Sequence, residues 1–486
     1  MTRGGLYILS SFKTKKEKYD AMRAAYWLDE DLKYHDPATL RASAETLLDA
    51  LYEASELRRK ARTKHLPQLE ILLLGLFKAS HTEDHCMAVQ LDSNRFSDMK
   101  HLSYRVTVEL IVNGLIQLGL LIKHTGYYGG LIGSVSRLQL TNPMLKFLKE
   151  SELDPNLIVS DRPRTLIRIK PPKGSPDRKP VLSASGRAEI LNIEHDLIAY
   201  NKKLGETFID LCVSEDEEAQ INQRMARKAK ETGEDRPSRL WLDKKFIYRV
   251  FNNNSTELGG RHYGGWWQTV PSEWRHRIVI DGEKTVEVDY GQQHFRMLYQ
   301  FEGSPMATTS SDLYQVHGMD PKHRDDNKDV YAALLNAKSR NQMARLICEK
   351  QRKGRSYVDG FPDGIKNATA LLKTLEAQHP EIEKYFYSGI GLSLQNVDSK
   401  IMHKVIMRLL FQHDVVALPI HDSVIVKSNY KDLLRDVMEE VYVDVMGVKP
   451  MLKVNDSMED KYLSLMDSNT GFQTRCKVFR EGFTGY

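Results

Sequence analysis

The stretch that decides the fold is Thr285-Val-Glu-Val-Asp289-Tyr-Gly-Gln-Gln-His-Phe-Arg296. Its first residues form a short, β-branched apolar run, which predicts a buried strand ending at Asp289. A second run, Leu418-Pro-Ile-His421-Asp422-Ser-Val-Ile-Val426, predicts another strand that carries Asp422. An ionised carboxylate in apolar surroundings costs several kcal/mol unless it is paired or binds a metal. We therefore predict that the two strands lie side by side and bring Asp289 and Asp422 together.

Two neighbouring carboxylates predict a cation site. They repel each other, and a divalent cation relieves the repulsion. Ligation by oxygen alone suits Mg²⁺, which keeps substrate phosphates among its ligands. Asp289 and Asp422 are therefore predicted to bind two Mg²⁺ ions, with Mn²⁺ as a substitute, at a site for phosphoryl transfer.

Both runs resemble motifs of a known superfamily. The segment from Asp289 to Arg296 is similar to the first palm motif of family A DNA polymerases. His421-Asp422-Ser423 is similar to their last palm motif, and its Ser follows the single-subunit phage-type RNA polymerases. The resemblance implies that Asp289 and Asp422 are catalytic and that the Tyr290 backbone carbonyl joins the metal ligands. It also implies that His421 orients Asp422 or the primer end.

A helix is predicted to begin near Arg324-Asp-Asp-Asn-Lys328. Its two cations share one face because they are four residues apart, and such a pair suits a nucleotide triphosphate. The fingers helix of the polymerase superfamily carries Arg and Lys at this spacing, with a Tyr where this chain has Asn336. The alternative is a surface helix with ordinary i, i+4 charges. The nucleotide-binding residues that the resemblance implies are Arg324, Lys328, Asn336, His294 and Tyr290.

A segment rich in glycine and tryptophan precedes the first palm motif, from Gly259 to Arg277. Glycines let the backbone approach a ligand closely, and Arg beside aromatic rings suits phosphate contact and base stacking. The segment resembles the Thr-Gly-Arg and Leu-Gln-Asn-Ile-Pro segments of the superfamily. The alternative is a glycine-rich turn anchored by core Trp residues. The nucleic-acid-binding residues predicted here are Arg261, Gln268, Arg275, Arg277 and, at the end of the palm motif, Arg296.

The N-terminal third has a different pattern. An amphipathic helix is predicted over residues 66–79, and a second helix runs from Ser103 to Leu118. A strand, a glycine-rich turn and another strand follow, which is the order found in a winged helix. The resemblance to winged-helix domains implies DNA contact through Arg105, Lys123 and Arg137. The alternative is a winged helix used for protein contact or for structure alone.

The predicted fold class is α+β, a right-hand polymerase with palm, fingers and thumb behind a winged-helix domain. Proline and basic residues between positions 163 and 185 predict a linker. The predicted parts are an N-terminal helical segment (1–60), the winged-helix domain (61–150), the linker (151–185), a thumb-like helical region (186–258), the first part of the palm (259–320), the fingers (321–395), and the second part of the palm with a C-terminal tail (396–486).

Composition is consistent with this division. A chain of 486 residues can hold several domains, and its net charge of +5 permits nucleic-acid binding. The four cysteines show no metal-binding spacing, which predicts a reduced, cytoplasmic protein. The chain has no apolar run of 18 residues and no signal-peptide pattern, so no membrane partner is expected.

These patterns predict a template-dependent nucleotidyltransferase that uses a DNA template, a primer strand and nucleoside triphosphates. His294 and Ser423 depart from the DNA polymerase pattern, because both positions carry Glu in those enzymes. A bulky His294 could still exclude a 2′-hydroxyl by volume, so a DNA polymerase is favoured. An RNA polymerase or primase is the first alternative. A non-catalytic replication initiator that binds an origin is the second.

Overall fold

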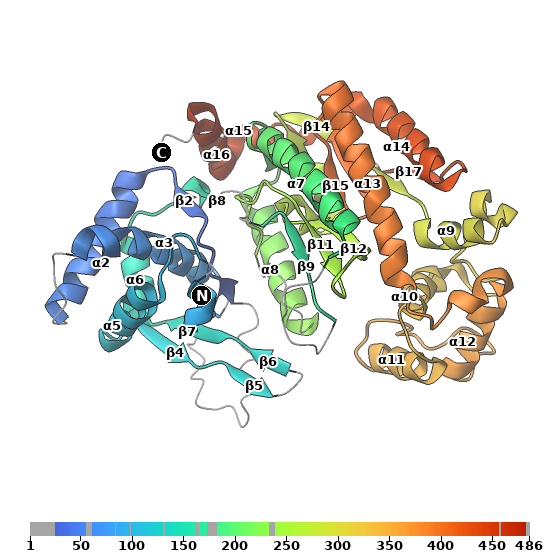
Figure 1. The fold of residues 1–486 in the computed structure, drawn as a ribbon, viewed down its shortest axis with the longest axis horizontal. Helices are drawn as coiled ribbons and strands as arrows, with labels where there is room; N and C mark the ends of the chain where they lie inside the picture. The colour runs from blue at the N-terminus through green and yellow to red at the C-terminus, as the bar shows by residue number, and fades with distance from the viewer. Residues whose placement is uncertain are drawn as a thin grey trace.

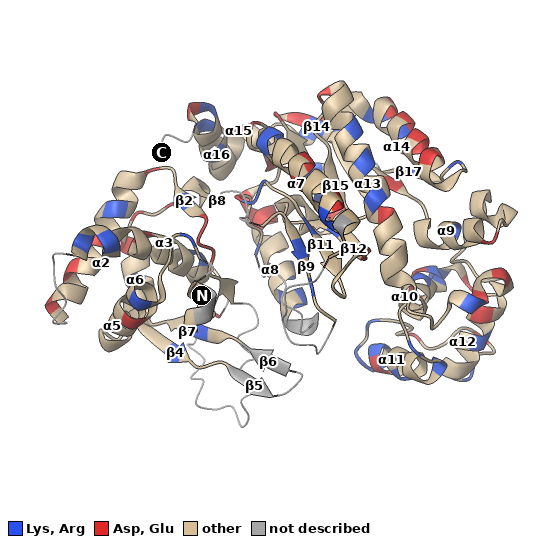
Figure 2. Cartoon of the chain, in the orientation of Figure 1, with Lys and Arg blue, Asp and Glu red and all other residues tan. Residues whose placement is uncertain are grey.

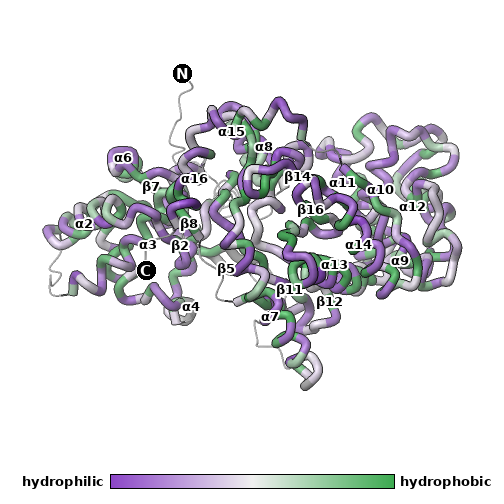
Figure 3. Tube along the Cα trace, turned by 90° about the horizontal axis from the view of Figure 1, so that it is seen from above, coloured by the Kyte–Doolittle hydropathy of each residue, from purple (hydrophilic) through white to green (hydrophobic). Residues whose placement is uncertain are grey.

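The computed structural model describes residues 25–54, 61–82, 84–97, 99–129, 132–160, 165–172, 182–232, 239–455 and 458–482. These residues have a mixed α+β architecture. An N-terminal unit, a sheet-containing middle part and a lobe of helices follow one another along the long axis of the molecule (Figures 1 and 3). None of the helices in these ranges is long and apolar enough to cross a membrane.

The N-terminal unit packs helices rich in leucine against a four-stranded sheet of order β1-β3-β7-β4. The predicted helix and its two following strands are present as η3 with α5, β4 and β7, but the glycine-rich segment expected as a turn contains the paired strands β5 and β6. Gly119 ends the second helix with φ +69°, as its lack of a Cβ allows. The elements are β1 (Tyr26–Trp27), β2 (Leu32–Tyr34), α2 (Pro37–Ala54), α3 (Arg62–Ser80), β3 (Cys86–Val89), α4 (Ser93–Phe96), the π-helical η3 (Arg105–Val112), α5 (Asn113–Gln117), β4 (Leu121–His124), β5 (Tyr127–Gly129), β6 (Ile132–Ser134), β7 (Ser136–Leu140) and α6 (Asn142–Glu150).

Two predicted boundaries differ from the structure. Residues 25–54 do not form a separate segment, because β1 pairs with β3 and α2 packs on α3 within one core. The described parts of the predicted linker also contain strands. β8 (Ile158–Ser160) pairs with β2, and β9 (Ile167–Ile169) pairs with β11 (Tyr248–Asn252). Strand pairing therefore orders these parts of the linker despite the many prolines nearby; residues 161–164 and 173–181 of the linker lie outside the described ranges.

The middle part contains the sheet that positions the site. Its strand order is β10-β13-β14-β16-β15, and β17 also pairs with β14. The strands are β10 (Ile209–Leu211), β13 (Ile278–Ile280), β14 (Glu283–Tyr290), β15 (Leu418–Ile420), β16 (Ser423–Lys427) and β17 (Leu452–Asn455). The predicted thumb-like region is not purely helical. Strand β10 lies between its helices α7 (Ala184–Gly205) and α8 (Glu215–Thr232), and β11 follows α8.

Two long helices support the sheet. Helix α13 (Gly391–His413) packs on β12 (Ser255–Tyr263) and on α14 (Lys431–Met446), as Figure 1 shows. Gly260 lies at φ +92°, and a Cβ there would come within 2.8 Å of the Ser399 hydroxyl oxygen. Glycine is therefore required where β12 crosses the helix. Two 3₁₀ turns, η5 (Trp266–Gln268) and η6 (Ser272–Arg277), connect β12 to β13.

The helical lobe contains the segment predicted as fingers (321–395) and also α9 and η7, which lie in the predicted first part of the palm (259–320). The same hydrophobic core continues from the sheet into this lobe through Phe295, Tyr331 and Leu371. Its elements are α9 (Gln293–Phe301), η7 (Pro305–Thr308), η8 (Pro321–His323), α10 (Arg324–Leu334), α11 (Arg340–Arg352), α12 (Ala368–Ala377) and η9 (Pro380–Tyr385). After η10 (Ser428–Tyr430), α14 and β17, the chain ends in η11 (Asp460–Tyr462), α15 (Leu465–Ser468) and α16 (Thr470–Glu481). Helix α16 contacts η4 (Pro155–Leu157) of the N-terminal unit.

Candidate active site

The strand that ends at Asp289 and the strand that follows Asp422 are neighbours, as predicted. Strand β14 pairs antiparallel with β16, and Asp289 lies opposite Ser423. Asp422 sits in the turn between β15 and β16, where the Tyr290 N–H donates to its carbonyl oxygen at 3.1 Å. His421 adopts φ +56° in this turn, a strained conformation for a residue with a Cβ. The tight turn therefore holds Asp422 next to the end of β14.

The electrostatic state of Asp289 depends on this neighbour. Its pKa is raised to about 6, first because the side chain is largely buried and then because the Asp422 carboxylate is near. Lys453 and Lys328 act in the opposite direction. The Asp289 Oδ1 atom is buried and has no hydrogen-bond partner among the described residues. The protein alone therefore disfavours the ionised form of Asp289, and a bound cation would stabilise that form.

The donor set fits a hard divalent cation. It consists of carboxylate oxygens, which Mg²⁺ prefers and which Mn²⁺ also accepts. Within the described ranges, no three His, Cys, Asp or Glu side chains are grouped closely enough to hold a metal ion by themselves. A site with two carboxylates leaves ligand positions for substrate phosphates, as Mg²⁺ sites commonly do.

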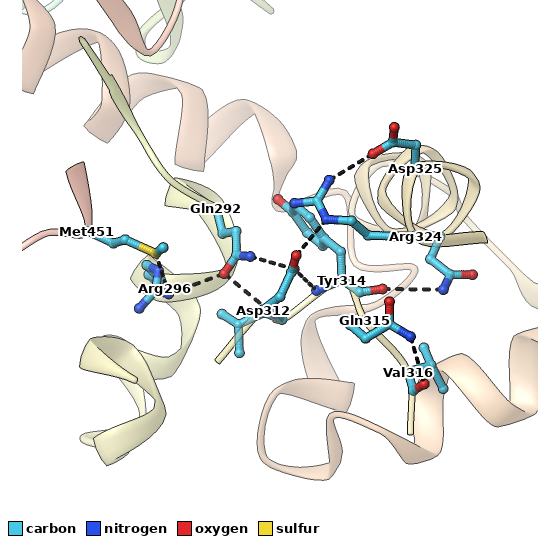
Figure 4. Close-up of polar contacts among 11 residues, drawn as sticks. Gln292, Arg296, Asp312, Tyr314, Gln315, Val316, Arg324, Asp325 and Met451 are labelled. Atoms are coloured by element: carbon cyan, nitrogen blue, oxygen red, sulfur yellow. Dashed lines mark hydrogen bonds and ion pairs between the residues drawn. The ribbon is translucent and has the colours of Figure 1, made fainter. Parts of the chain in front are cut away.

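Arg324 and Lys328 lie on α10 as predicted, but in different states. Arg324 forms ion pairs with Asp312 at 2.5 Å and with Asp325 at 2.8 Å, and it lies over the Tyr314 ring (Figure 4). Lys328 is exposed and has no ion pair within 4 Å in the part of the chain that the structure describes. Its charge acts on Asp289. Lys328 is therefore available to a phosphate. Arg324 could bind a phosphate only after its ion pair with Asp312 or Asp325 breaks.

A buried aspartate that sequence reasoning missed organises the other side of the site. Asp398 is 0% exposed, and its Oδ2 accepts from Arg261 Nε at 2.9 Å and Nη2 at 2.5 Å. His294 Nε2 lies 3.7 Å from the same oxygen. The sequence feature that could have indicated this role is an Asp on the apolar face of the helix α13. Its helical neighbours on that face are Leu394, Ile401 and Val405.

Asp398 therefore holds Arg261 at the site, and His294 lies close to the same carboxylate. Arg261 keeps 18% of its side chain exposed and His294 keeps 23%. The ring of Tyr263 lies edge-on to the ring of His421, with centroids 6.3 Å apart, and His421 is exposed. Arg261, His294 and His421 therefore stay accessible to a ligand near Asp289.

Several residues predicted to contact ligands instead brace the fold. Arg296 is 2% exposed and donates to the carbonyls of Gly291, Ala307 and Thr309. It therefore ties the segment between β14 and α9 to η7 and the residue after it. Arg277 is buried and donates to the Cys212 carbonyl and to Glu217. Both cations satisfy internal acceptors, so the predicted contacts with nucleic acid stay predictions that would require these hydrogen bonds to break.

The side chains of Gln268 and Tyr290 also form hydrogen bonds within the fold. The Gln268 amide donates to the carbonyls of His262 and Pro419, which fixes η5 against β15. The Tyr290 ring is 2% exposed, and its hydroxyl donates to the Met438 carbonyl. The side chain of Tyr290 therefore does not reach a nucleotide, and only its backbone lies at the site.

Arg275 lines a cavity of about 920 Å³ over the sheet face that carries Asp289. Its guanidinium pairs with Glu287 at 2.7 Å, and Ser423 Oγ donates to the same carboxylate at 2.6 Å. Lys453 lies opposite Asp289 on β17 and lines the same cavity. Both acidic and basic side chains therefore line this cavity, and Asp289 is one of them.

The remaining predicted residues lie farther from this cavity. Asn336 is exposed, and its amide donates to the Ala332 carbonyl. In the N-terminal unit Arg105 and Lys123 are exposed. Arg137 is 3% exposed and donates to the Val135 carbonyl, so little of its side chain is accessible to a phosphate. Residues 25–160 contain 15 Lys and Arg against 17 Asp and Glu, a net charge of −2.

Comparison with solved structures yields 91 matching chains, and the one described here is a weak likeness. No protein-family model and no curated protein matches this sequence. Among solved structures, the chain matches the POL domain of Pol1 from M. smegmatis, in complex with DNA primer-template and dNTP, at 15% identity and a TM-score of 0.27. The match covers 48% of this chain, which spans about half (50%) of the length of that structure. A TM-score this low does not establish a shared fold.

Proposed function

We propose that this chain is a Mg²⁺-dependent nucleotidyltransferase that extends a primer on a template strand. The observation that carries the proposal is the pairing of β14 with β16, which sets Asp289 beside Asp422; Asp289 Oδ1 is buried and has no hydrogen-bond partner among the described residues. A structural carboxylate would be expected to accept hydrogen bonds from the protein. An unsatisfied, partly protonated carboxylate near a second one instead suits a cation site.

Each side chain has a role in this reaction. Asp289 and Asp422 would hold Mg²⁺, which supplies charge stabilisation to the transferring phosphoryl group and lowers the pKa of the primer 3′-hydroxyl. Lys328 would bind the triphosphate of the incoming nucleotide. Arg324 would join it after leaving Asp312. Because the pKa of Asp289 is raised to about 6, this carboxylate is ionised for metal binding at neutral pH and largely protonated in mild acid.

Arg261 and His294 would act on the growing strand and the sugar. Asp398 fixes Arg261 through two hydrogen bonds, and His294 lies beside the same carboxylate, so both side chains face the same part of the site. A 2′-hydroxyl on the nucleotide would meet His294, and exclusion by volume favours deoxynucleotides. Ser423 supports the alternative, an RNA polymerase or primase. In this chain the Ser423 hydroxyl donates to Glu287 on β14.

The N-terminal unit is proposed to be a winged helix that contacts duplex DNA through Arg105 and Lys123. Its net charge of −2 makes this contact weak at physiological salt, because phosphate contacts supply most non-specific affinity. This charge also argues against the second alternative, a non-catalytic initiator that depends on this unit for origin binding.

A primer-extension assay separates these possibilities. Labelled primer on a template is incubated with Mg²⁺ and either deoxynucleotides or ribonucleotides, beside a lane without primer and a lane with chelator. We expect extension with deoxynucleotides only, and none without metal. Products in the lane without primer would identify a primase. An absence of extension with either sugar would refute the proposed function.

A further inference from the structure

Positive charge is concentrated in one short segment of the helical lobe. Residues 338–373 contain nine Lys and Arg against three Asp and Glu, a net charge of +6. The whole chain carries +5, so the other 450 residues together carry −1. Figure 2 shows Lys and Arg along α11 and the loop beside it. A net charge confined to 36 residues points to an anionic partner at that surface.

Four of these cations gather on one exposed surface. Arg345, Arg352 and Lys353 lie on or directly after α11, and Arg355 follows in the loop. The pKa of Glu349 is lowered, first by Lys353 and further by Arg352 and Arg355, so these three cations surround one carboxylate. Arg345 lies one helical turn before Glu349 on the same face. We call Arg345, Arg352, Lys353 and Arg355 the α11 basic surface.

This surface is attached to the helix that carries Lys328. The loop after α11 is anchored by Ser356 Oγ, which donates to Asp326 at 3.1 Å. Tyr357 is 1% exposed, and its hydroxyl donates to Asn327 at 2.8 Å. Asp326 and Asn327 lie between Arg324 and Lys328 in the first turns of α10. The α11 basic surface is therefore held at a fixed position relative to the candidate nucleotide-binding side chains.

We propose that the α11 basic surface binds the unpaired template strand ahead of the site. The inference rests on the proposed function, because a polymerase needs single-stranded template next to the incoming nucleotide. Residues 340–355 contain no aromatic side chain, so base stacking does not contribute there. Contact through Arg and Lys to phosphates alone makes the interaction independent of sequence and strongly dependent on salt.

Binding of two DNA probes by the full-length protein tests this inference. One probe is a recessed primer-template with a single-stranded 5′ overhang, and the other is the same duplex with blunt ends. Removal of three cations by Arg345→Ala, Arg352→Ala and Arg355→Ala should lower overhang affinity on the order of tenfold and reduce the salt slope by about 2. Affinity for the blunt duplex should stay unchanged.

Two matched variants control for folding and for total charge. Replacement of the same three arginines by Lys keeps the charge and should keep overhang binding. Ala at three exposed cations of the α14 region, Lys431, Arg435 and Lys449, removes equal charge and should have no effect. Unchanged overhang affinity in the Ala variant would overturn the inference, as would an equal loss on both probes, which would assign the surface to duplex.

The proposed function is tested separately in the same preparations. If wild-type protein extends primers and the Ala variant binds overhang normally, only the inference fails. If wild-type protein does not extend primers, and the Ala variant binds the overhang more weakly than wild type does, the surface binds single strands and the proposed function fails.

Discussion

Replacement of Asp289 by Asn is expected to stabilise the metal-free protein. The pKa of Asp289 is raised to about 6 from its ordinary value of 3.8, first through burial and then through Asp422. The folded protein therefore binds this proton more tightly than the unfolded chain does. The stability contributed by the proton is fully present below about pH 4 and is lost as the pH rises through about 6. At neutral pH, where Asp289 is ionised, the wild-type protein therefore lacks this contribution to its free energy of unfolding.

The size of this contribution follows from the difference between the two pKa values. A difference of about 2 corresponds to roughly 3 kcal/mol, and partial solvent access of the carboxylate lowers this to about 2 kcal/mol. Asn has the same shape but cannot ionise. It also loses the attraction of Lys453 and Lys328. We therefore expect Asp289→Asn to raise the free energy of unfolding at neutral pH by about 1–2 kcal/mol.

Urea unfolding with chelator present, followed by tryptophan fluorescence, measures this change. Trp266 and Trp267 are 2% and 0% exposed and share a core with β14, so they report on the sheet. Asp432→Asn is the matched control, because that side chain is 81% exposed. A variant less stable than wild type at neutral pH, or one whose stability still falls between about pH 4 and about pH 6, would refute the reasoning.

Three further predictions follow from individual contacts. Lys328→Ala should raise the apparent KM for nucleotide roughly tenfold while the Kd for primer-template stays constant; an effect confined to DNA binding would move this side chain to the template. Asp398→Asn should lower the free energy of unfolding by about 3 kcal/mol, because Arg261 then lacks its buried counter-charge; a loss below about 1 kcal/mol in urea unfolding would contradict the pairing. Arg137→Ala should destabilise the protein by about 1–3 kcal/mol through the Val135 contact without changing duplex affinity, and weakened duplex binding in a stable variant would restore the phosphate contact.

The strands and helices of the site could be predicted because their patterns are local. The apolar runs before Asp289 and Asp422 form β14, β15 and β16, and the helix expected at Arg324 begins at that residue. The pairing of β14 with β16 was expected from two carboxylates that each needed a partner. These inferences require only the period of a strand or helix and the cost of a buried charge.

The partners of the cations could not be predicted from the sequence. Arg296 and Arg277 looked like phosphate ligands, but both satisfy internal acceptors that lie far away in the chain or in other turns. Asp398 was missed because its role depends on β12 crossing α13. The pairings that join residues before position 61 and after position 150 to the N-terminal unit could not be predicted for a related reason. Strands β1 and β8 are too short to be recognised without the strands with which they pair.

Single-turnover nucleotide incorporation tests the central claim most directly. Wild-type protein, Asp289→Asn and Asp422→Asn are compared with Mg²⁺, saturating primer-template and saturating nucleotide, after each variant is shown to be folded and to bind primer-template. Loss of charge stabilisation in the transition state should slow incorporation in each variant by at least about 100-fold. Incorporation at the wild-type rate in both variants would contradict the assignment of this carboxylate pair as the catalytic site.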